Sequence, residues 1–412
     1  MGRQIRFPRN MNAENDMRDT CIAPSNSTDI ASVVRTEAVR GRMNLRWISP
    51  ATGILFAFVT MGGSACTSNP TWLRRSMSVG AGGADLERSA GVLHVNLPDG
   101  QAAEIGYEVL KARHRTKESP WVVLVPGSGA PSRRGEQSGD GVISYSAEVH
   151  VHTQWASALA GAGYPVFAFD KRTCHPRHRP LCRANPSTDM DREGPGALAR
   201  DVDAACAWIR AQQGANTKVI LFAHGQGLSP VLQSACARDA AGLVGLSPIP
   251  RRIDRVLVHA LEHRQERMEQ EAEITQNAER RAQLETVSAG LRNQAATLHE
   301  TFVSMNRGDF APDARIRGST LAYWRGWIRD TAQAQSRIKS LRIPKLFLLG
   351  AEDRQYGPED QTLIRRFSRL PATSVQEVPG ADHHLLQDEK LSSYAVNAVL
   401  HWLLQREDAP DA

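Results

Sequence analysis

The chain has 412 residues, of which 41% are hydrophobic and 23% are charged, and this balance is ordinary for a globular protein and excludes a fibrous or wholly disordered chain. The formal net charge is +6, but residues 1–80 contain 10 Arg and 5 acidic residues, so most of the excess lies there. The remainder is nearly neutral and has no aromatic-rich basic motif, so nucleic acid is not an expected partner.

The amino-terminal segment is expected to be a targeting sequence rather than part of the fold. Residues 1–42 are polar and lack periodicity, which indicates a non-structural extension before a second methionine, Met43. Residues 43–66 have a basic residue, Arg46, near their start, continue through a short apolar run and end in small residues. This order is typical of a secretory signal, and the apolar run is too short to span a bilayer.

The signal-like segment ends in Gly-Ser-Ala-Cys, which resembles the lipidation box of bacterial lipoproteins, although Gly63 stands where such boxes usually carry Leu. We therefore expect an exported protein, either periplasmic or anchored to the membrane through a lipid on Cys66. A disordered tail with a chance apolar patch is the alternative. Residues 67–89 are expected to be a linker.

Beyond the linker, short apolar runs alternate with helix-like segments, which predicts an α/β fold with a mostly parallel sheet flanked by helices. The first two runs are joined near Pro98-Asp99-Gly100 and predict an antiparallel hairpin at the sheet edge. The predicted strands are Gly91–Asn96, Ile105–Leu110, Trp121–Val125, Pro165–Phe169, Lys218–Phe222, Gly242–Leu246, Lys345–Leu349 and Ser374–Val378. The predicted helices include Trp155–Ala162, Gly196–Gln213 and Tyr394–Gln405.

Two cysteines flank a short proline-containing loop. Cys174 and Cys182 are eight residues apart, so a turn between them allows a disulfide in an oxidising compartment. Free thiols, or a metal site completed by His175 and His178, are the alternatives. The spacing is not a standard zinc pattern, so we expect the disulfide and no metal.

The stretch 251–311 interrupts the alternation of strands and helices. It contains no proline, is dense in charge, and repeats apolar residues at helical spacing. We expect a helical cap insertion between the core segments 90–250 and 312–408. A lid over the site and a hairpin that simply packs on the body both fit this pattern.

A glycine-rich turn follows the predicted strand Lys218–Phe222. Its sequence is Ala223-His224-Gly225-Gln226-Gly227. A nucleophile elbow needs small residues at both flanks because the turn from strand to helix is tight, and its centre carries the nucleophile on a strained backbone. Here the centre is Gly225, which has no side chain. The pattern matches neither a dinucleotide-binding loop nor a P-loop, and no cofactor is expected.

A second glycine-containing loop follows the predicted strand Trp121–Val125. Its backbone N–H groups at Ser128 and Gly129, together with the N–H of Gln226, are placed to form an oxyanion hole. An ordinary turn is the alternative. Ser229 and Cys236 lie too far along the next helix to replace the missing nucleophile.

An acid and a histidine follow in the chain order that this arrangement requires. Asp353 ends the predicted strand Lys345–Leu349, and His383 lies in a loop after the last strand. A carboxylate that holds a histidine in the correct tautomer is the logic of a catalytic triad. Asp382 and His384 are the neighbours that could be confused with this pair.

At these residues the chain resembles bacterial α/β-hydrolase esterases. The shared features are the Gly-Ser-Gly loop, the strand end Asp170-Lys171-Arg172, and an elbow of the form G-H-S-x-G with glycine in place of serine. The resemblance covers roughly residues 90–405. It implies an α/β-hydrolase fold and a small-molecule ester or related acyl substrate.

The glycine leaves three hypotheses for function. His383 activates a water that takes the place of the serine oxygen, so that weak hydrolysis remains. Alternatively, the fold is a pseudoenzyme that binds a small molecule or a protein partner without catalysis. In the third hypothesis Gly225 is a replacement in an ordinary esterase. The sequence carries no signal of oligomeric state.

Overall fold

The computed structural model describes residues 85–96, 102–113, 119–129, 132–137, 148–174, 182, 194–249 and 251–407. All of these residues belong to one compact unit of the chain. The predicted extension 1–42, the signal 43–66 with Cys66, and residues 67–84 of the linker lie outside the described residues. A search of the described part of the chain finds no helix with the length and apolar character of a membrane span.

An eight-stranded sheet forms the centre of the fold. Its strands are β1 (Leu86–Asn96), β2 (Ala102–Ala112), β3 (Trp121–Val125), β6 (Val166–Phe169), β7 (Val219–His224), β8 (Gly242–Leu246), β11 (Lys345–Gly350) and β12 (Thr373–Val378). Their order is β1-β2-β6-β3-β7-β8-β11-β12. The six strands from β6 to β12 pair in parallel, whereas β1, β2 and β6 pair antiparallel. The predicted α/β fold class is confirmed.

The edge hairpin is longer than its sequence pattern indicates. β1 begins at Leu86, inside the segment 67–89 that we expected to be a linker. The first residues of this strand have exposed or half-buried side chains, so they do not form the apolar run that marks the other strands. Pairing along the whole length of β2 holds them in the sheet.

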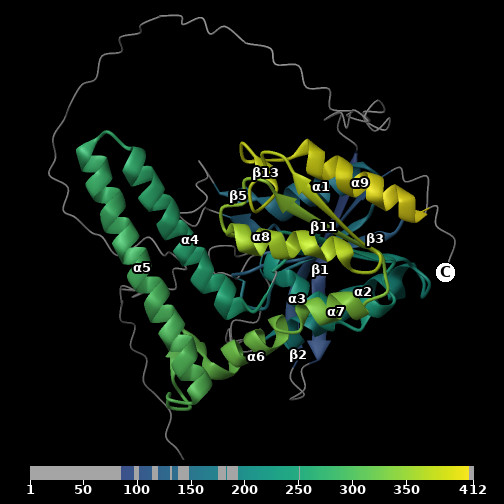
Figure 1. Cartoon of the computed structure of the whole chain (residues 1–412). Helices are drawn as coiled ribbons and strands as arrows, with labels where there is room; N and C mark the ends of the chain where they lie inside the picture. The colour runs from purple at the N-terminus through teal and green to yellow at the C-terminus, as the bar shows by residue number, and fades with distance from the viewer. Residues whose placement is uncertain are drawn as a thin grey trace, which may run out of the picture. The chain divides into compact units, whose positions relative to one another are not determined.

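Helices cover both faces of the sheet, because successive side chains of a strand point to opposite faces. Leu221 of β7 belongs to one buried cluster and its neighbour Phe222 to the other. Helices α1 (Val151–Gly161) and α9 (Ser393–Glu407) contribute to the cluster of Phe222. Helices α2 (Pro195–Gln213) and α3 (Leu228–Gln233) contribute to the opposite one. Figure 1 shows these two pairs on opposite sides of the strands.

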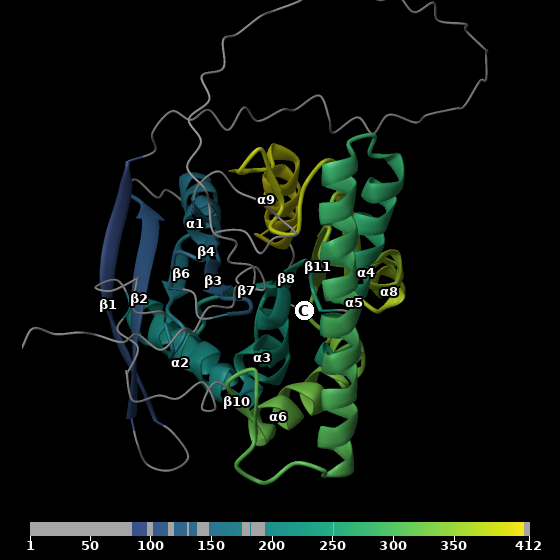
Figure 2. The same cartoon turned by 90° about the vertical axis from the view of Figure 1, so that its left-hand side faces the viewer.

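A helical hairpin stands between β8 and β11. Helix α4 (Ile253–Ile274) and helix α5 (Ala278–Arg307) run side by side (Figure 2). Asn277 accepts a hydrogen bond from the backbone N–H of Arg280 and so caps the start of α5, while Gly308 ends it in the left-handed region. Leu291, Leu298 and Phe302 bury one face of α5 in the core cluster that also contains residues of α4.

The remaining elements connect the hairpin and the sheet to the rest of the fold. They are α6 (Leu321–Thr331), α7 (Ala334–Ser340), α8 (Pro358–Arg365), the short 3-10 helices η4 (Gly225–Gly227), η5 (Cys236–Arg238) and η6 (Arg366–Arg369), and the two-residue strands β4 (Glu136–Gln137), β5 (Val149–His150), β9 (Arg315–Ile316), β10 (Ser319–Thr320), β13 (Leu386–Gln387) and β14 (Lys390–Leu391).

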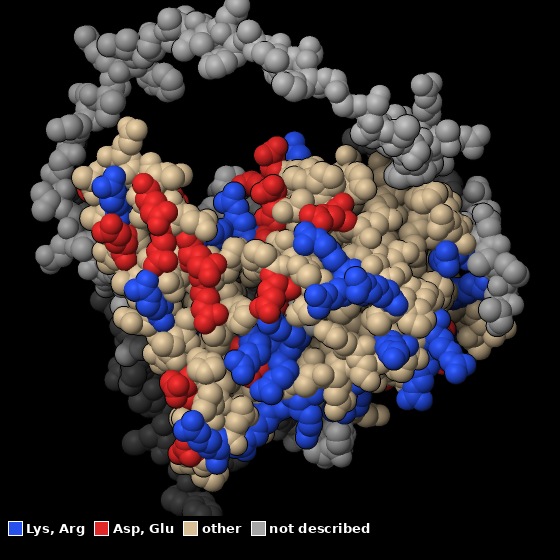
Figure 3. Space-filling model, viewed as in Figure 1, with Lys and Arg blue, Asp and Glu red and all other residues tan. Residues whose placement is uncertain are grey.

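The base of the hairpin is attached to α6 and α8. The backbone N–H of Ile253 donates to the Thr331 hydroxyl at 2.9 Å. The Arg251 guanidinium lies 2.5 Å from the buried Asp360 carboxylate. Burial opposes the charge of Arg251, but Asp360 and Glu359 outweigh it and raise the pKa of Arg251. On the face shown in Figure 3, acidic side chains gather on the left and upper parts with basic ones among them, and basic side chains predominate at the lower right.

Replacing Gly290 in α5 is expected to stabilise the protein. A Cβ built at Gly290 meets no atom within 4 Å, and alanine has a higher helix propensity than glycine. Gly290→Ala should therefore raise the free energy of unfolding by about 0.5–1 kcal/mol, measured by urea denaturation. Gly308→Ala is the matched control and should lower it, because φ is +88° at this residue. A lower midpoint for Gly290→Ala would contradict a continuous helix α5.

Candidate active site

The candidate site lies where parallel strands end. β7 ends at His224, and Gly225 follows it at φ +50°, in the left-handed region that most side chains avoid. The chain then turns through η4 into α3. This is a tight strand-to-helix turn at the carboxyl edge of the sheet, where ligands of parallel α/β folds bind.

Gly227 brings this turn against the loop after β3. A Cβ at Gly227 would lie 2.6 Å from the carbonyl oxygen of Pro126 and 2.9 Å from that of Val125. These are backbone atoms, so they cannot move aside as the end of a side chain does. Glycine at this position lets the turn that carries Gln226 pack directly on the start of the Gly127-Ser128-Gly129 loop.

His383 and Asp353 come together from the ends of β12 and β11. The Nδ1 atom of His383 lies 2.8 Å from the Oδ2 atom of Asp353, which is 3% exposed. The other carboxylate oxygen accepts hydrogen bonds from the backbone N–H groups of Gln355 and Tyr356. An ionised carboxylate only accepts, so the histidine donates from Nδ1 and its Nε2 is left as an acceptor.

The two neighbours of His383 have other roles. Asp382 accepts hydrogen bonds from the backbone N–H groups of His384 and Leu386, both at 2.8 Å, and so shapes the loop. The ring of His384 packs on that of His224.

The Nε2 atom of His383 lies close to Gly225. A Cβ built at Gly225 would lie 3.9 Å from Nε2 and 4.0 Å from the carbonyl oxygen of Ser247, and these are its nearest neighbours. An oxygen attached to that Cβ would therefore reach hydrogen-bond distance of the imidazole. The structure thus brings Gly225, His383 and Asp353 together.

The loop that contains Ser128 and Gly129 is attached to the strand end of β6. The ammonium group of Lys171 donates to the carbonyl oxygen of Gly129 at 2.7 Å, and Gly129 has a φ of +78°. The Arg133 guanidinium forms a two-pronged ion pair with Asp170, at 2.9 Å and 2.7 Å. Asp170 and Lys171, the two residues that follow β6, therefore bind Arg133 and Gly129 and position this part of the chain. Sequence reasoning did not identify Arg133.

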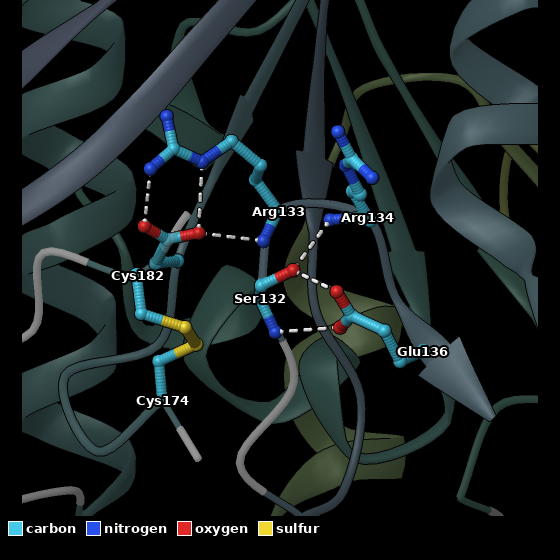
Figure 4. The surroundings of a disulfide bond; sticks show 7 residues. Ser132, Arg133, Arg134, Glu136, Cys174 and Cys182 are labelled. Atoms are coloured by element: carbon cyan, nitrogen blue, oxygen red, sulfur yellow. Dashed lines mark hydrogen bonds and ion pairs between the residues drawn. A yellow bond between two sulfur atoms is a disulfide. The ribbon is translucent and has the colours of Figure 1, made fainter. Parts of the chain in front are cut away.

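A second group of contacts supports the same loop (Figure 4). The Ser132 hydroxyl donates to the buried Glu136 carboxylate, whose other oxygen accepts from the Ser132 backbone N–H at 2.9 Å. Nearby, Cys174 and Cys182 form a disulfide with a Cα separation of 5.7 Å. His175 and His178, which sequence reasoning considered as metal ligands, lie outside the described residues.

A second disulfide joins Cys206 of α2 to Cys236 of η5. The sequence indicated no pairing for these two residues, since they are 30 positions apart and no local pattern links them. Ser229 is buried in α3. The Cys236 thiol is engaged in the disulfide.

Some of the described residues have side-chain ligand atoms close enough together to hold a metal ion. The group whose ligand atoms lie close enough together is Asp170, Cys174 and Cys182. The two sulfur atoms are bonded to each other, and the carboxylate of Asp170 is bound to Arg133. A disulfide offers no thiolate, so these residues do not fit a metal site.

Four buried histidines lie at or near the site. The rings of His224, His383 and His384 are mutual neighbours, with centroids 5.0 to 5.3 Å apart. Burial lowers the pKa of His224 and of His384 well below the ordinary value of 6.5, and the neighbouring imidazoles lower both further. Burial also lowers the pKa of His152 in α1 to about 4, which the charge of Glu136 partly offsets.

Two residues that sequence reasoning missed surround His383. Ser247 follows β8 and donates its hydroxyl hydrogen to the carbonyl oxygen of His383 at 2.7 Å. The ring of Tyr356 packs edge-on against the imidazole, with centroids 5.1 Å apart. Neither residue belongs to a recognisable motif, so only the folded arrangement identifies them.

Similar solved structures include a proline iminopeptidase of Mycobacterium smegmatis, with a TM-score of 0.48 and 15% identity over 78% of this chain and 100% of that one. Est1E from Butyrivibrio proteoclasticus has a TM-score of 0.45 and 12% identity over 77% and 100%. A peroxisomal alpha-beta-hydrolase of Saccharomyces cerevisiae has a TM-score of 0.44 and 14% identity over 79% and 91%.

A search of curated protein sequences finds no match. The sequence profile of the alpha/beta hydrolase family, in contrast, matches residues 122–391, which is well over half of the chain. This range contains β3 from Val122 onward, all of β7, β8, β11 and β12, and the loops that follow these strands. The chain therefore belongs to the alpha/beta hydrolase family.

Proposed function

We propose that the protein is an esterase-like hydrolase in which Gly225 occupies the position of the nucleophilic serine and a water molecule attacks the substrate instead. The observation that carries this proposal is the geometry around Gly225. A side chain at this position would point to the Nε2 atom of His383, which is oriented by Asp353. A buried histidine held by a carboxylate beside such a turn is the arrangement of the general base in acyl-transfer triads.

Each residue of the site has a part in the proposed reaction. Nε2 of His383 takes a proton from the water as its oxygen bonds to the carbonyl carbon of the ester. The substrate oxygen becomes negative and accepts hydrogen bonds from the backbone N–H groups of Gln226, Ser128 and Gly129. The imidazolium, stabilised by Asp353, then gives its proton to the leaving alcohol as the tetrahedral intermediate collapses. The products are a carboxylic acid and an alcohol, without an acyl-enzyme.

The expected rate is low but measurable. Triads that lack a member retain about 10³- to 10⁴-fold acceleration over water, from the oxyanion hole and from binding. The water is also less well positioned than an oxygen attached to the chain. Slow hydrolysis of small acyl esters is therefore the activity that the proposal implies.

We also propose that the protein is exported. Disulfides persist in oxidising compartments, and the described residues contain two, Cys174–Cys182 and Cys206–Cys236. This supports the signal-like segment 43–66. Release into the periplasm and anchoring through a lipid on Cys66 are both consistent with it, and mass spectrometry of the mature protein distinguishes them.

Ester hydrolysis by the wild-type protein tests the proposed function. We expect turnover of short and medium acyl esters above the rate in buffer, and loss of that turnover in His383→Ala. His401→Ala, on the exposed face of α9, is the matched control and should keep the activity. If the wild-type protein does not hydrolyse any ester but a ligand raises its melting temperature, it is a non-catalytic binder and the proposal is wrong.

A further inference from the structure

Ser247 has an unusual backbone conformation beside the site. It is fully buried, and its φ of +40° lies in the left-handed region although it is not a glycine. Such a conformation costs of order 1 to 3 kcal/mol and persists only where the surroundings impose it. Non-glycine residues of this kind occur at functional sites more often than elsewhere, so the role of this one needs a physical explanation.

Hydrogen bonds hold Ser247 in this conformation from three directions. Its backbone N–H donates to the carbonyl oxygen of Leu348 in β11 at 2.8 Å. Its hydroxyl donates to the carbonyl oxygen of His383 at 2.7 Å. Its own carbonyl oxygen accepts from the Tyr356 hydroxyl at 3.1 Å. Ser247 is therefore fixed relative to the loop that carries the histidine.

These bonds direct the Ser247 carbonyl oxygen toward Gly225. It lies 4.0 Å from a Cβ built at Gly225, nearly as close as the Nε2 atom of His383 at 3.9 Å. A carbonyl oxygen has two lone pairs, so it can accept a second hydrogen bond besides that of Tyr356. Burial and the charge of Asp353 raise the pKa of Tyr356 well above its ordinary value, so its hydroxyl stays a donor throughout the working range of pH.

We propose that the Ser247 carbonyl oxygen and Nε2 of His383 together bind the attacking water, and that Tyr356 is the residue that positions this carbonyl. The inference rests on the proposed hydrolysis. A water between these two acceptors donates both of its hydrogens, one to each. Its lone pairs then face away from both acceptors and toward the substrate carbonyl carbon.

A site without the serine needs a second hydrogen-bond acceptor to orient the attacking water. A serine oxygen is fixed by its own Cβ and needs only the histidine to take its proton. A free water has no such attachment, so a second fixed hydrogen bond is needed to orient it. In the attack, the hydrogen facing His383 moves to Nε2 while the other remains on the oxygen, bonded to Ser247. The new acid keeps that hydrogen.

The test compares Tyr356→Phe in two backgrounds, wild type and Gly225→Ser. In the wild-type background we expect kcat/KM for ester hydrolysis to fall about tenfold, mainly through kcat, which is the effect of losing one orienting hydrogen bond. In the Gly225→Ser background the loss should be within about threefold, since a tethered hydroxyl needs no second acceptor. Tyr164→Phe is the matched control and should change neither rate, because this buried tyrosine precedes β6 at the amino end of that strand, whereas the site lies at the carboxyl ends.

Two outcomes overturn the inference. An equal loss in both backgrounds would mean that Tyr356 is only structural. A high-resolution crystal structure of the wild-type protein without a water in hydrogen-bond contact with both Nε2 and the Ser247 carbonyl would also exclude the site, whatever the activity. If the water is present but no ester is hydrolysed, the water site stands and the proposed function fails.

Discussion

Replacing Gly225 by serine is expected to raise ester hydrolysis by about 10³-fold or more. Removing the serine of a complete triad lowers kcat by up to about 10⁶-fold, so restoring it recovers a large part of that factor if the rest of the site is in place. A Cβ at residue 225 has no neighbour closer than 3.9 Å, so the side chain fits. The measurement is kcat/KM for short acyl esters, with a burst of released alcohol as the sign of an acyl-enzyme.

The controls separate the hydroxyl from the change in backbone. Gly225→Ala carries the same penalty for a side chain at φ +50°, about 1 to 3 kcal/mol, but has no nucleophile. It should lose stability without gaining activity. Gly225→Ser combined with His383→Ala should lose the gain. If Gly225→Ser folds but hydrolyses no faster than Gly225→Ala, the oxyanion loop or the histidine is not competent.

The strands of the sheet could be predicted because their burial is continuous. Every residue of β3, β7 and β11 is buried, so each appears in the sequence as an apolar run, with the buried polar residues His224 and Lys345 only at the end of β7 and the start of β11. β1 lies at the sheet edge with several exposed side chains, so the sequence of its first residues resembles that of a linker. The sequence therefore indicates the interior of this sheet better than its edge.

Some residues of the candidate site can likewise be identified from the sequence, and others only from the fold. Asp353 and His383 stand out because each follows a recognisable strand, and the structure places their side chains 2.8 Å apart, although their catalytic role is still a prediction. Ser247 and Tyr356 do not stand out, because they act through contacts between residues more than 100 positions apart. A local sequence pattern indicates neither a contact between distant residues nor the positive φ of Ser247.

Acidification is expected to destabilise the protein steeply below pH 6.5. The folded protein holds His152, His224 and His384 neutral, because burial lowers the pKa of each, to about 4 for His152. In the unfolded chain these groups bind protons near pH 6.5. Their stabilising contribution is therefore complete above pH 6.5 and is lost as the pH falls toward the folded-state pKa. For His152 alone the loss is about 2 kcal/mol between pH 7 and pH 5.

Urea denaturation at a series of pH values measures this loss, and two variants assign it. His152→Phe removes the titrating group and keeps an aromatic ring against Gly135, so its stability should fall by about 2 kcal/mol less than that of the wild type between pH 7 and pH 5. His401→Gln, on an exposed face, should follow the wild type. Parallel curves for wild type and His152→Phe would show that His152 is not held neutral. A larger loss of stability in His152→Phe than in the wild type would also contradict the prediction, because removing a histidine with a lowered pKa must reduce the loss on acidification.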